Sequence, residues 1–179
     1  YFLKEESLIV KWEVHNTGDE EMYFTIGGHP AFRFEKEGEK KTDYMLRFPN
    51  KESLEYILVN LAESAADPDT VYQLELKDEC CGLNDEMFEK DALIFDGGQF
   101  DEVWIYHKDG TPYVGMKCAG FPNFGIWSVK DAPFVCLEPW MGRCDNVGFD
   151  KELSEKPYVN RVKVGESFEQ SYEILAARS

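Results

Sequence analysis

Short alternations of apolar and polar residues run through most of the chain. The clearest is Ser7–His15, where every second residue from Leu8 to Val14 is apolar, which is typical of a strand with one buried face. Turn-forming residues follow at 16–19, and the alternation at 22–26 then predicts the second arm of a hairpin. Further short strands are expected at residues 44–48, 54–59, 71–76, 103–107, 113–117, 124–128, 134–138, 159–164 and 168–175.

Helical periodicity is scarce. Only residues 84–90, with Asn84 as a candidate N-cap, and residues 150–155 favour short helices. Gly, Pro, Asn and Asp separate nearly all of the expected strands, and no internal repeat or linker-like stretch divides the chain. The pattern predicts an all-β fold, an antiparallel β-sandwich or barrel-like pair of sheets, built as one domain over residues 1–179.

Composition and charge exclude several classes of partner. The chain has 35 Asp plus Glu against 19 Lys plus Arg, a formal charge of −16, which disfavours nucleic acid and anionic membrane surfaces. Its uncharged apolar runs, such as residues 132–137, are far shorter than the roughly 20 residues that span a bilayer. A hydrophobic content of 43% and an aromatic content of 15% supply enough apolar surface for a globular core.

Cysteine usage indicates a reducing compartment. The five cysteines are an odd number without regular spacing, and two of them are sequence neighbours, so we expect free thiols and a cytoplasmic setting. No metal-binding motif is present, and neither a phosphate-binding glycine loop nor a hydrolase nucleophile elbow occurs. No metal site is therefore expected.

Histidine is the side chain whose ordinary pKa lies nearest to neutrality, so a site for proton transfer would most naturally use one of the three present. His29 lies between Gly27-Gly28 and Pro30 at the end of an expected strand, where small neighbours leave room for a ligand. Its ring could equally close the turn through a hydrogen bond to a backbone carbonyl. His15 and His107 are expected to be exposed turn residues.

One carboxylate and several tryptophans stand out from their surroundings. Glu138 interrupts an apolar strand, and a desolvated carboxyl there would have a raised pKa, as a general base or acid near neutral pH requires. The alternative is a structural ion pair with Arg143. Trp104, Trp127 and Trp140 could stack on a sugar ring or could belong to the core.

Two motifs carry a family resemblance. Residues 25–32, Thr-Ile-Gly-Gly-His-Pro-Ala-Phe, and residues 134–142, Phe-Val-Cys-Leu-Glu-Pro-Trp-Met-Gly, resemble the aldose 1-epimerase or galactose mutarotase family. Residues 125–128 and 164–168 look like later strands of the same family. The resemblance covers essentially the whole chain in the right order, and it is nearest to a bacterial, mutarotase-like branch.

The resemblance implies a galactose mutarotase-like β-supersandwich and a set of site residues. His29 matches the general acid and Glu138 the general base, while Asp91, or alternatively Asp96, matches an aspartate that holds sugar hydroxyls. The chemistry needs no cofactor. Members of the family ordinarily carry an additional N-terminal block of strands with a sugar-contacting arginine, so we expect this chain to lack that block and to self-associate through exposed edges.

The leading hypothesis is therefore an epimerase that interconverts the α and β anomers of a free aldohexose, a small-molecule sugar. One alternative is a non-catalytic sugar-binding module in which Trp127 and Trp140 stack on the ligand. A second alternative is an epimerase of a hexose 6-phosphate, for which Arg33 and Arg143 would supply local positive charge despite the acidic chain.

Overall fold

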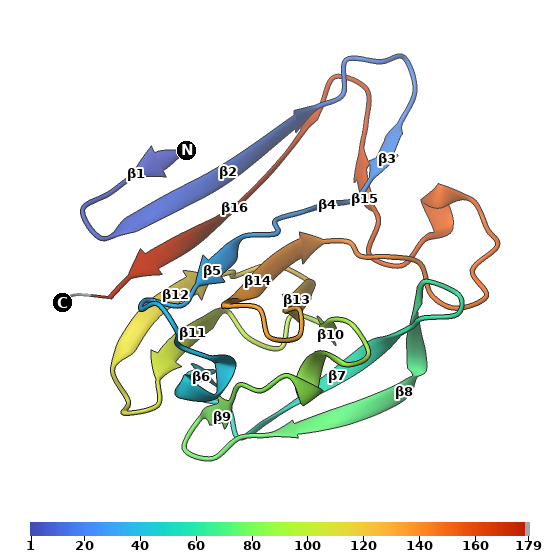
Figure 1. The fold of residues 1–179 in the computed structure, drawn as a ribbon. Coiled ribbons are helices and arrows are strands. Elements are labelled where there is room, and N and C mark those ends of the chain that lie inside the picture. The colour runs from blue at the N-terminus through green and yellow to red at the C-terminus, as the bar shows by residue number, and fades with distance from the viewer. Residues whose placement is uncertain (178–179) are drawn as a thin grey trace.

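Two large antiparallel sheets form the protein, as the strand pattern predicts. The computed structural model describes residues 1–177. Figure 1 shows the long strands at the two chain ends lying side by side, above a second group of strands that includes β14, β13, β10 and β7. The all-β sandwich expected from the sequence is confirmed.

The first sheet has seven strands and contains both ends of the described chain. In spatial order the strands are β1 (Phe2–Leu3), β2 (Ser7–His15), β16 (Ser167–Ala176), β12 (Pro112–Lys117), β11 (Glu102–His107), β6 (Tyr44–Arg47) and β9 (Cys80–Gly82). A long ladder joins β2 to β16, from the pair His15 and Ser167 to the pair Ser7 and Leu175.

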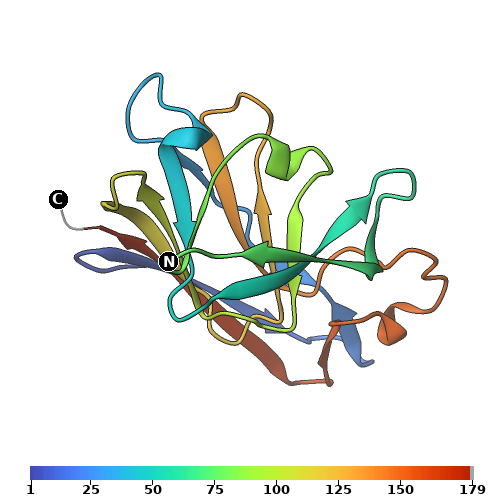
Figure 2. The same ribbon diagram turned by 90° about the horizontal axis from the view of Figure 1, so that it is seen from below.

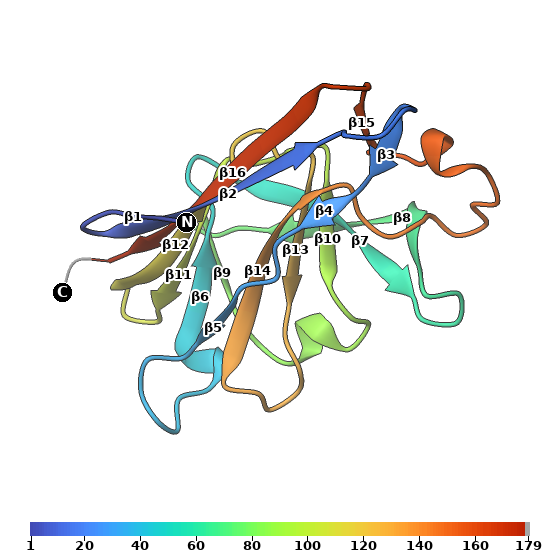
Figure 3. The same cartoon turned by 90° about the horizontal axis from the view of Figure 1, so that it is seen from above.

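The second sheet also has seven strands, and they lie side by side in Figure 3. In order they are β4 (Ile26–Gly27), β14 (Phe134–Met141), β13 (Asn123–Trp127), β10 (Leu93–Asp96), β7 (Ser53–Asn60) and β8 (Ala65–Glu75), and β5 (Ala31–Arg33) also pairs with β14. Figure 2 shows β7 and β8, drawn in teal and green, as the long hairpin at one side of this sheet.

The hairpin predicted between Ser7–His15 and residues 22–26 is wrong. The second arm is instead split into β3 (Met22–Phe24), which pairs with β15 (Asn160–Val162), and β4, which pairs with β14. β16 occupies one edge of β2 and β1 pairs with part of the other edge, while the segment after β2 finds its pairing partners in β15 and β14.

The two expected helices are reduced to single 3-10 turns. They are η2 (Glu86–Phe88) and η3 (Leu153–Glu155), and a third turn, η1 (Lys41–Asp43), precedes β6. Asn84 acts as the expected cap, because its side-chain oxygen accepts a hydrogen bond from the Met87 amide at 3.0 Å. In residues 1–177, no helix is both long and apolar enough to span a membrane.

The second sheet packs apolar side chains on both of its faces. Leu93 and Phe95 point into the main core between the sheets. Ile94, between them, points to the opposite face, where it packs with Ile57 and Ala66 in a second apolar cluster. Because successive strand residues alternate between faces, every central strand of this sheet supplies both clusters.

His107 differs from its predicted position in an exposed turn. Its side chain is only 16% exposed and lies 3.2 Å from the Glu35 carboxylate. Its ring also packs between those of Tyr44 and Tyr113. The prediction for His107 is wrong because Tyr44 on β6 and Tyr113 on the adjacent strand β12 pack against the ring. His15, whose side chain is 59% exposed, is as open as expected.

A buried lysine ties η1 to the connection between β13 and β14. The Lys41 ammonium group donates to the carbonyl oxygens of Val129 at 2.7 Å and Ala132 at 3.1 Å, and it lies 2.8 Å from the Asp85 carboxylate. The side chain is 4% exposed, so its removal leaves two carbonyl groups and a carboxylate without their partner.

Lys41→Met should therefore lower the free energy of unfolding by about 2 kcal/mol, because it removes a buried cation from its hydrogen-bond acceptors. Urea denaturation measures the change. Lys40→Met, at the exposed neighbouring position, is the matched control and should change stability by less than about 0.5 kcal/mol. Equal effects of the two substitutions would contradict the role of Lys41.

Candidate active site

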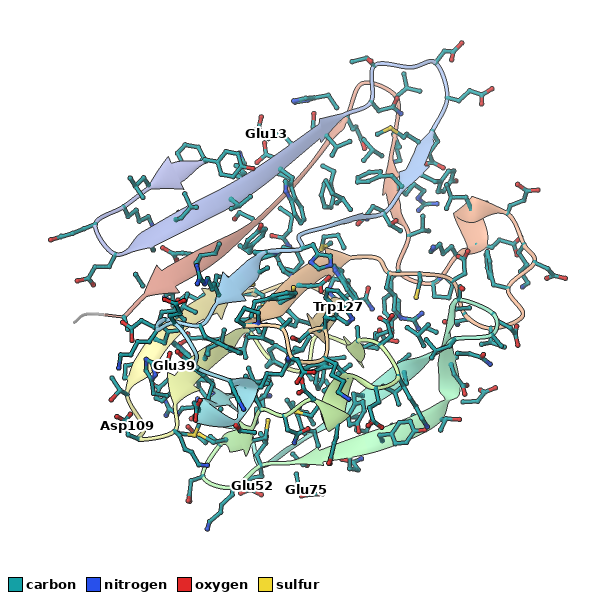
Figure 4. The ribbon with its side chains drawn as sticks, viewed as in Figure 1. Glu13, Glu39, Glu52, Glu75, Asp109 and Trp127 are labelled. Carbon is teal, nitrogen blue, oxygen red and sulfur yellow. The ribbon has the colours of Figure 1, made fainter. Side chains whose placement is uncertain are left out.

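A cavity of about 680 Å³ opens on the face of the second sheet that points away from the main core. Residues around β4, the ends of β7 and β10, and the strands β13 and β14 line it. Trp127, labelled in Figure 4, lies toward the middle of the molecule, whereas the labelled acidic residues lie at its periphery. Most of the residues that line the cavity are apolar or glycine, and a few polar and charged groups lie among them, as in many sites for small molecules.

Strand β14 places the carboxylate in this cavity. Val135 and Leu137 point into the main core, so the intervening residues Cys136 and Glu138, followed by Trp140, point to the opposite face. Glu138 is only 3% exposed. The alternation explains why an acidic residue interrupts an otherwise apolar strand.

Burial raises the pKa of Glu138 to about 7. The nearby His29 ring and a hydrogen bond from the Trp140 side chain both lower the Glu138 pKa, and the charge of Asp91 raises it, but desolvation is the largest influence. Glu138 therefore exchanges its proton close to neutral pH, which a general base or acid requires.

His29 is held opposite Glu138 by the strand segments on either side of it. The Gly28 amide donates to the Pro139 carbonyl at 2.9 Å, and the Leu137 amide donates to the Pro30 carbonyl at 3.2 Å. These bonds attach the chain before and after His29 to β14. The ring nitrogen Nδ1 then lies 3.5 Å from Glu138 Oε1, with the imidazole side chain 60% exposed. The polar neighbour of the His29 ring is therefore the Glu138 carboxylate and not a backbone carbonyl of the turn.

The two glycines before His29 allow aromatic side chains from other strands to pack directly against the backbone. A Cβ atom at Gly27 would lie 2.4 Å from Trp140 Cδ1, and one at Gly28 would lie 3.0 Å from the Tyr172 hydroxyl oxygen. Both glycines still line the cavity, as expected of small residues beside a ligand site, but the positions that their side chains would take are occupied. Their free space is filled by aromatic rings that pack against the backbone.

Asp91 lies in the cavity, where its charge acts on Glu138. Its backbone has a φ of 74°, a left-handed conformation that Asp adopts more readily than most residues. One carboxylate oxygen accepts a hydrogen bond from the Ala92 amide at 2.7 Å. The carboxylate is exposed enough to accept further hydrogen bonds from a ligand.

Asp96 and Arg143 are paired with each other. Arg143 Nε and Nη2 both donate to the Asp96 carboxylate, at distances from 2.8 to 3.0 Å, and Nη1 donates to Cys144 and Asn146. The Arg143 side chain is 3% exposed. The ion pair between Glu138 and Arg143, which the sequence left as an alternative, is not formed.

The sequence analysis missed one wall of the cavity. Val59, Leu61 and Ser64, from the end of β7 and its turn, line the side opposite to β4, and Ile94 lies beneath them. No local motif marks these residues, because pairing between distant strands brings them there. Cys136 could have been found, since it precedes Glu138 by two residues and must share its face of the strand.

Three potential metal ligands gather around the carboxylate. Donor atoms of His29, Cys136 and Glu138 all lie within 4.8 Å of one another. Burial, followed by the charge of Glu138, raises the pKa of the Cys136 thiol to about 12, so this side chain stays protonated and is a poor metal ligand at neutral pH. The arrangement fits proton transfer between an imidazole and a carboxyl group better.

Two curated proteins are similar in sequence to nearly the whole of this chain. No model of a protein family matches the chain. The chromosomal protein LacX of Lactococcus lactis subsp. lactis is 30% identical over 185 aligned positions, which cover 97% of this chain and 59% of LacX. The plasmid-encoded LacX of the same organism matches to the same extent. The chain therefore spans about three fifths of the length of these curated relatives.

Solved structures are also similar to this chain over nearly its whole length. A galactose mutarotase-related enzyme from Lactobacillus acidophilus superposes with a TM-score of 0.87 and 27% identity, over 98% of this chain and 59% of that one. A galactose mutarotase-like protein from Lactobacillus casei superposes with a TM-score of 0.82 and 20% identity, over 98% and 60% of the two chains. The chain thus has the galactose mutarotase-like β-sandwich fold, and its resemblance to the aldose 1-epimerase family is confirmed.

Proposed function

We propose that the protein interconverts the α and β anomers of a neutral, free aldohexose. The observation that carries this proposal is the pair formed by Glu138 and His29, whose nearest atoms lie 3.5 Å apart in the cavity. One member is buried with a pKa of about 7, and the other is open to a ligand. The likeness to a galactose mutarotase-related enzyme supports the same reaction.

In the proposed reaction, the Glu138 carboxylate removes the proton of the anomeric hydroxyl group while the His29 imidazolium protonates the ring oxygen. The bond between C1 and the ring oxygen breaks, and an open-chain aldehyde forms. After rotation about C1–C2, the ring oxygen attacks the other face of C1. Protonated Glu138 returns its proton to the carbonyl oxygen, and His29 takes back its own, so no proton is gained or lost.

The remaining cavity residues would hold the sugar. Asp91 is the better candidate for accepting hydrogen bonds from hydroxyl groups, because its carboxylate lines the cavity whereas Asp96 is engaged by Arg143. Trp127 and Trp140 offer aromatic surface to the apolar side of a pyranose. Arg143 would act indirectly, by holding the end of β14 through its ion pair.

Charge favours a neutral substrate over a hexose phosphate. Among the described residues that line the cavity, Arg143 is the one permanent cation, and its guanidinium group is already bonded to Asp96, Cys144 and Asn146. Arg33, the other arginine considered for a phosphate, lies outside the cavity. The two carboxylates of Asp91 and Glu138 would repel a phosphate group.

The state of the cysteines supports a reducing, cytoplasmic setting for this function. All five are free thiols, and Cys118 and Cys136 are buried. Burial raises the pKa of the Cys118 thiol to about 12, which makes it unreactive toward oxidation at neutral pH.

Glu138→Gln should abolish the acceleration of anomer exchange, because positioned proton transfer contributes about 10² to 10⁴ in rate. Two-dimensional exchange NMR on glucose and galactose measures the rate. Glu102→Gln, a carboxylate in the other sheet, is the matched control and should retain the wild-type rate. Exchange at the buffer rate with wild-type protein, together with a tryptophan fluorescence change on adding sugar, would overturn catalysis in favour of a sugar-binding module.

Glucose should be a better substrate than glucose 6-phosphate by at least tenfold in kcat/KM, because the cavity offers a phosphate no free cation among its described residues. Competition between the two sugars in the exchange experiment tests this expectation. A preference for glucose 6-phosphate would contradict the proposal of a neutral substrate. So would binding of glucose 6-phosphate that is lost in Arg33→Gln.

The raised pKa of the buried Glu138 carboxyl should also make the free energy of unfolding depend on pH. Since folding raises the Glu138 pKa from its ordinary value near 4.5 to about 7, the folded state binds the proton more tightly, and stability falls as pH rises from about 4.5 to 7. Glu138→Gln should remove roughly 2 to 3 kcal/mol of this fall. Urea denaturation at pH 5 and pH 8 measures it; an unchanged difference in the variant would refute the raised pKa. Glu102→Gln should keep the wild-type difference.

A further inference from the structure

The Trp140 indole ring covers a glycine on each of the two strands that flank β14. A Cβ atom at Gly27 on β4 would lie 2.4 Å from the ring atom Cδ1, and one at Gly125 on β13 would lie 2.3 Å from Cη2 and Cζ2. The five-membered ring thus covers one glycine and the six-membered ring covers the other. Any larger residue at Gly125 would displace the ring.

This placement turns the indole nitrogen toward Glu138. Gly27 is the cross-strand partner of Trp140 itself, whereas Gly125 is the partner of Glu138. The ring therefore leans back along β14 toward the carboxyl group two residues earlier, which shares its face of the strand. The interaction of the Trp140 side chain with Glu138 lowers the pKa of that carboxyl against the effect of burial.

The same local arrangement occurs once more, outside the cavity. Trp104 on β11 follows Glu102 by two residues, lies over Gly115 on β12, and donates its indole N–H to the Glu102 carboxylate. A Cβ atom at Gly115 would lie 2.4 Å from Trp104 Cδ2. The same spacing of glutamate and tryptophan on one strand, with glycine on a neighbouring strand, thus occurs in both sheets. Glu102 is not among the residues that line the cavity.

We propose that Trp140 is a positioning residue for the catalytic carboxyl group: its indole N–H, fixed by Gly27 and Gly125, orients Glu138 toward His29 and stabilises the ionised carboxylate. The catalytic consequence rests on the proposed anomer exchange, but the effect on Glu138 does not. This role differs from stacking on a sugar, because it acts through the edge of the ring instead of its face.

The contact matters because Glu138 has few other stabilising neighbours. The titratable or charged groups around it in the cavity are His29 from the segment between β4 and β5, Asp91 before β10, Cys136 on β14, and Arg143 and Cys144 after β14. Asp91 is anionic, the Cys136 thiol is protonated at neutral pH, and Arg143 is bonded to Asp96. Trp140 and His29 are therefore the groups that favour the ionised form.

Titration of Glu138 in protein labelled with ¹³C at the glutamate carboxyl carbons tests the proposal without reference to activity. Glu138→Gln identifies the resonance. Trp140→Phe keeps an aromatic ring but removes the N–H, and it should raise the pKa of Glu138 by about one pH unit. Trp104→Phe, the matched control at the equivalent contact, should leave the Glu138 titration unchanged. A Glu138 titration that is the same in Trp140→Phe and wild-type protein would overturn the proposal.

Replacement of Trp140 by benzothienylalanine keeps the shape of the ring and replaces the N–H by sulfur, so it separates hydrogen bonding from packing. The proposal expects the same rise in pKa, and a rise confined to Trp140→Phe would overturn it. Below pH 8, anomer exchange in the same samples should be slower than with wild-type protein, because a smaller fraction of Glu138 is ionised there. If wild-type protein shows no exchange, the proposed function fails, while the titration still decides the role of Trp140.

Discussion

The site depends on one buried carboxyl group, Glu138, with which no lysine or arginine among residues 1–177 forms an ion pair. Strand β14 supplies the main core with one row of side chains, and the opposite row places Glu138 against the apolar outer cluster of the second sheet. Desolvation there holds the pKa of Glu138 near 7, whereas the pKa of an exposed glutamate is about 4.5. His29, whose Nδ1 lies 3.5 Å from Glu138 Oε1, is the nearest basic group. The structure thus gives up electrostatic stability at this position, and it gains a group that can both accept and donate a proton.

The charged groups near the cavity fall into two kinds. Asp96 and Arg143 satisfy each other through several hydrogen bonds and connect the ends of β10 and β14, so their role is to hold the sheet together. Glu138, His29 and Asp91 have fewer protein partners and line the cavity. Such a division is physically reasonable, because a fully bonded charge is fixed in its ionisation state, whereas a proton-transfer group must be able to change it.

Local patterns predicted the all-β class and most of the strands, since alternation and turn residues act over a few positions, but they missed the short strands β1, β5 and β9 and the central strand β10. They also singled out His29 and Glu138 as separate candidates. The family resemblance added the roles of His29 and Glu138. Long-range pairing could not be predicted: β2 takes β16 as its partner instead of the next segment, and Arg143 finds Asp96 47 residues away. The burial of His107 depends equally on aromatic rings from other strands. The sequence favoured Asp91 but left Asp96 open, because Asp91 precedes β10 and Asp96 is the last residue of the same short strand.

The pH dependence of anomer exchange tests the central claim most directly. If Glu138 must be ionised to act as the base while His29 is protonated to act as the acid, the exchange rate catalysed by wild-type protein should be bell-shaped in pH. Its acidic limb should have a midpoint near pH 7, the value to which burial brings the Glu138 carboxyl, and the rate should fall again as the imidazolium is lost at higher pH. The buffer-catalysed rate, measured at each pH without protein, is subtracted. A midpoint near the ordinary carboxyl value of 4.5, or a rate that does not change between pH 5 and pH 8, would contradict the account.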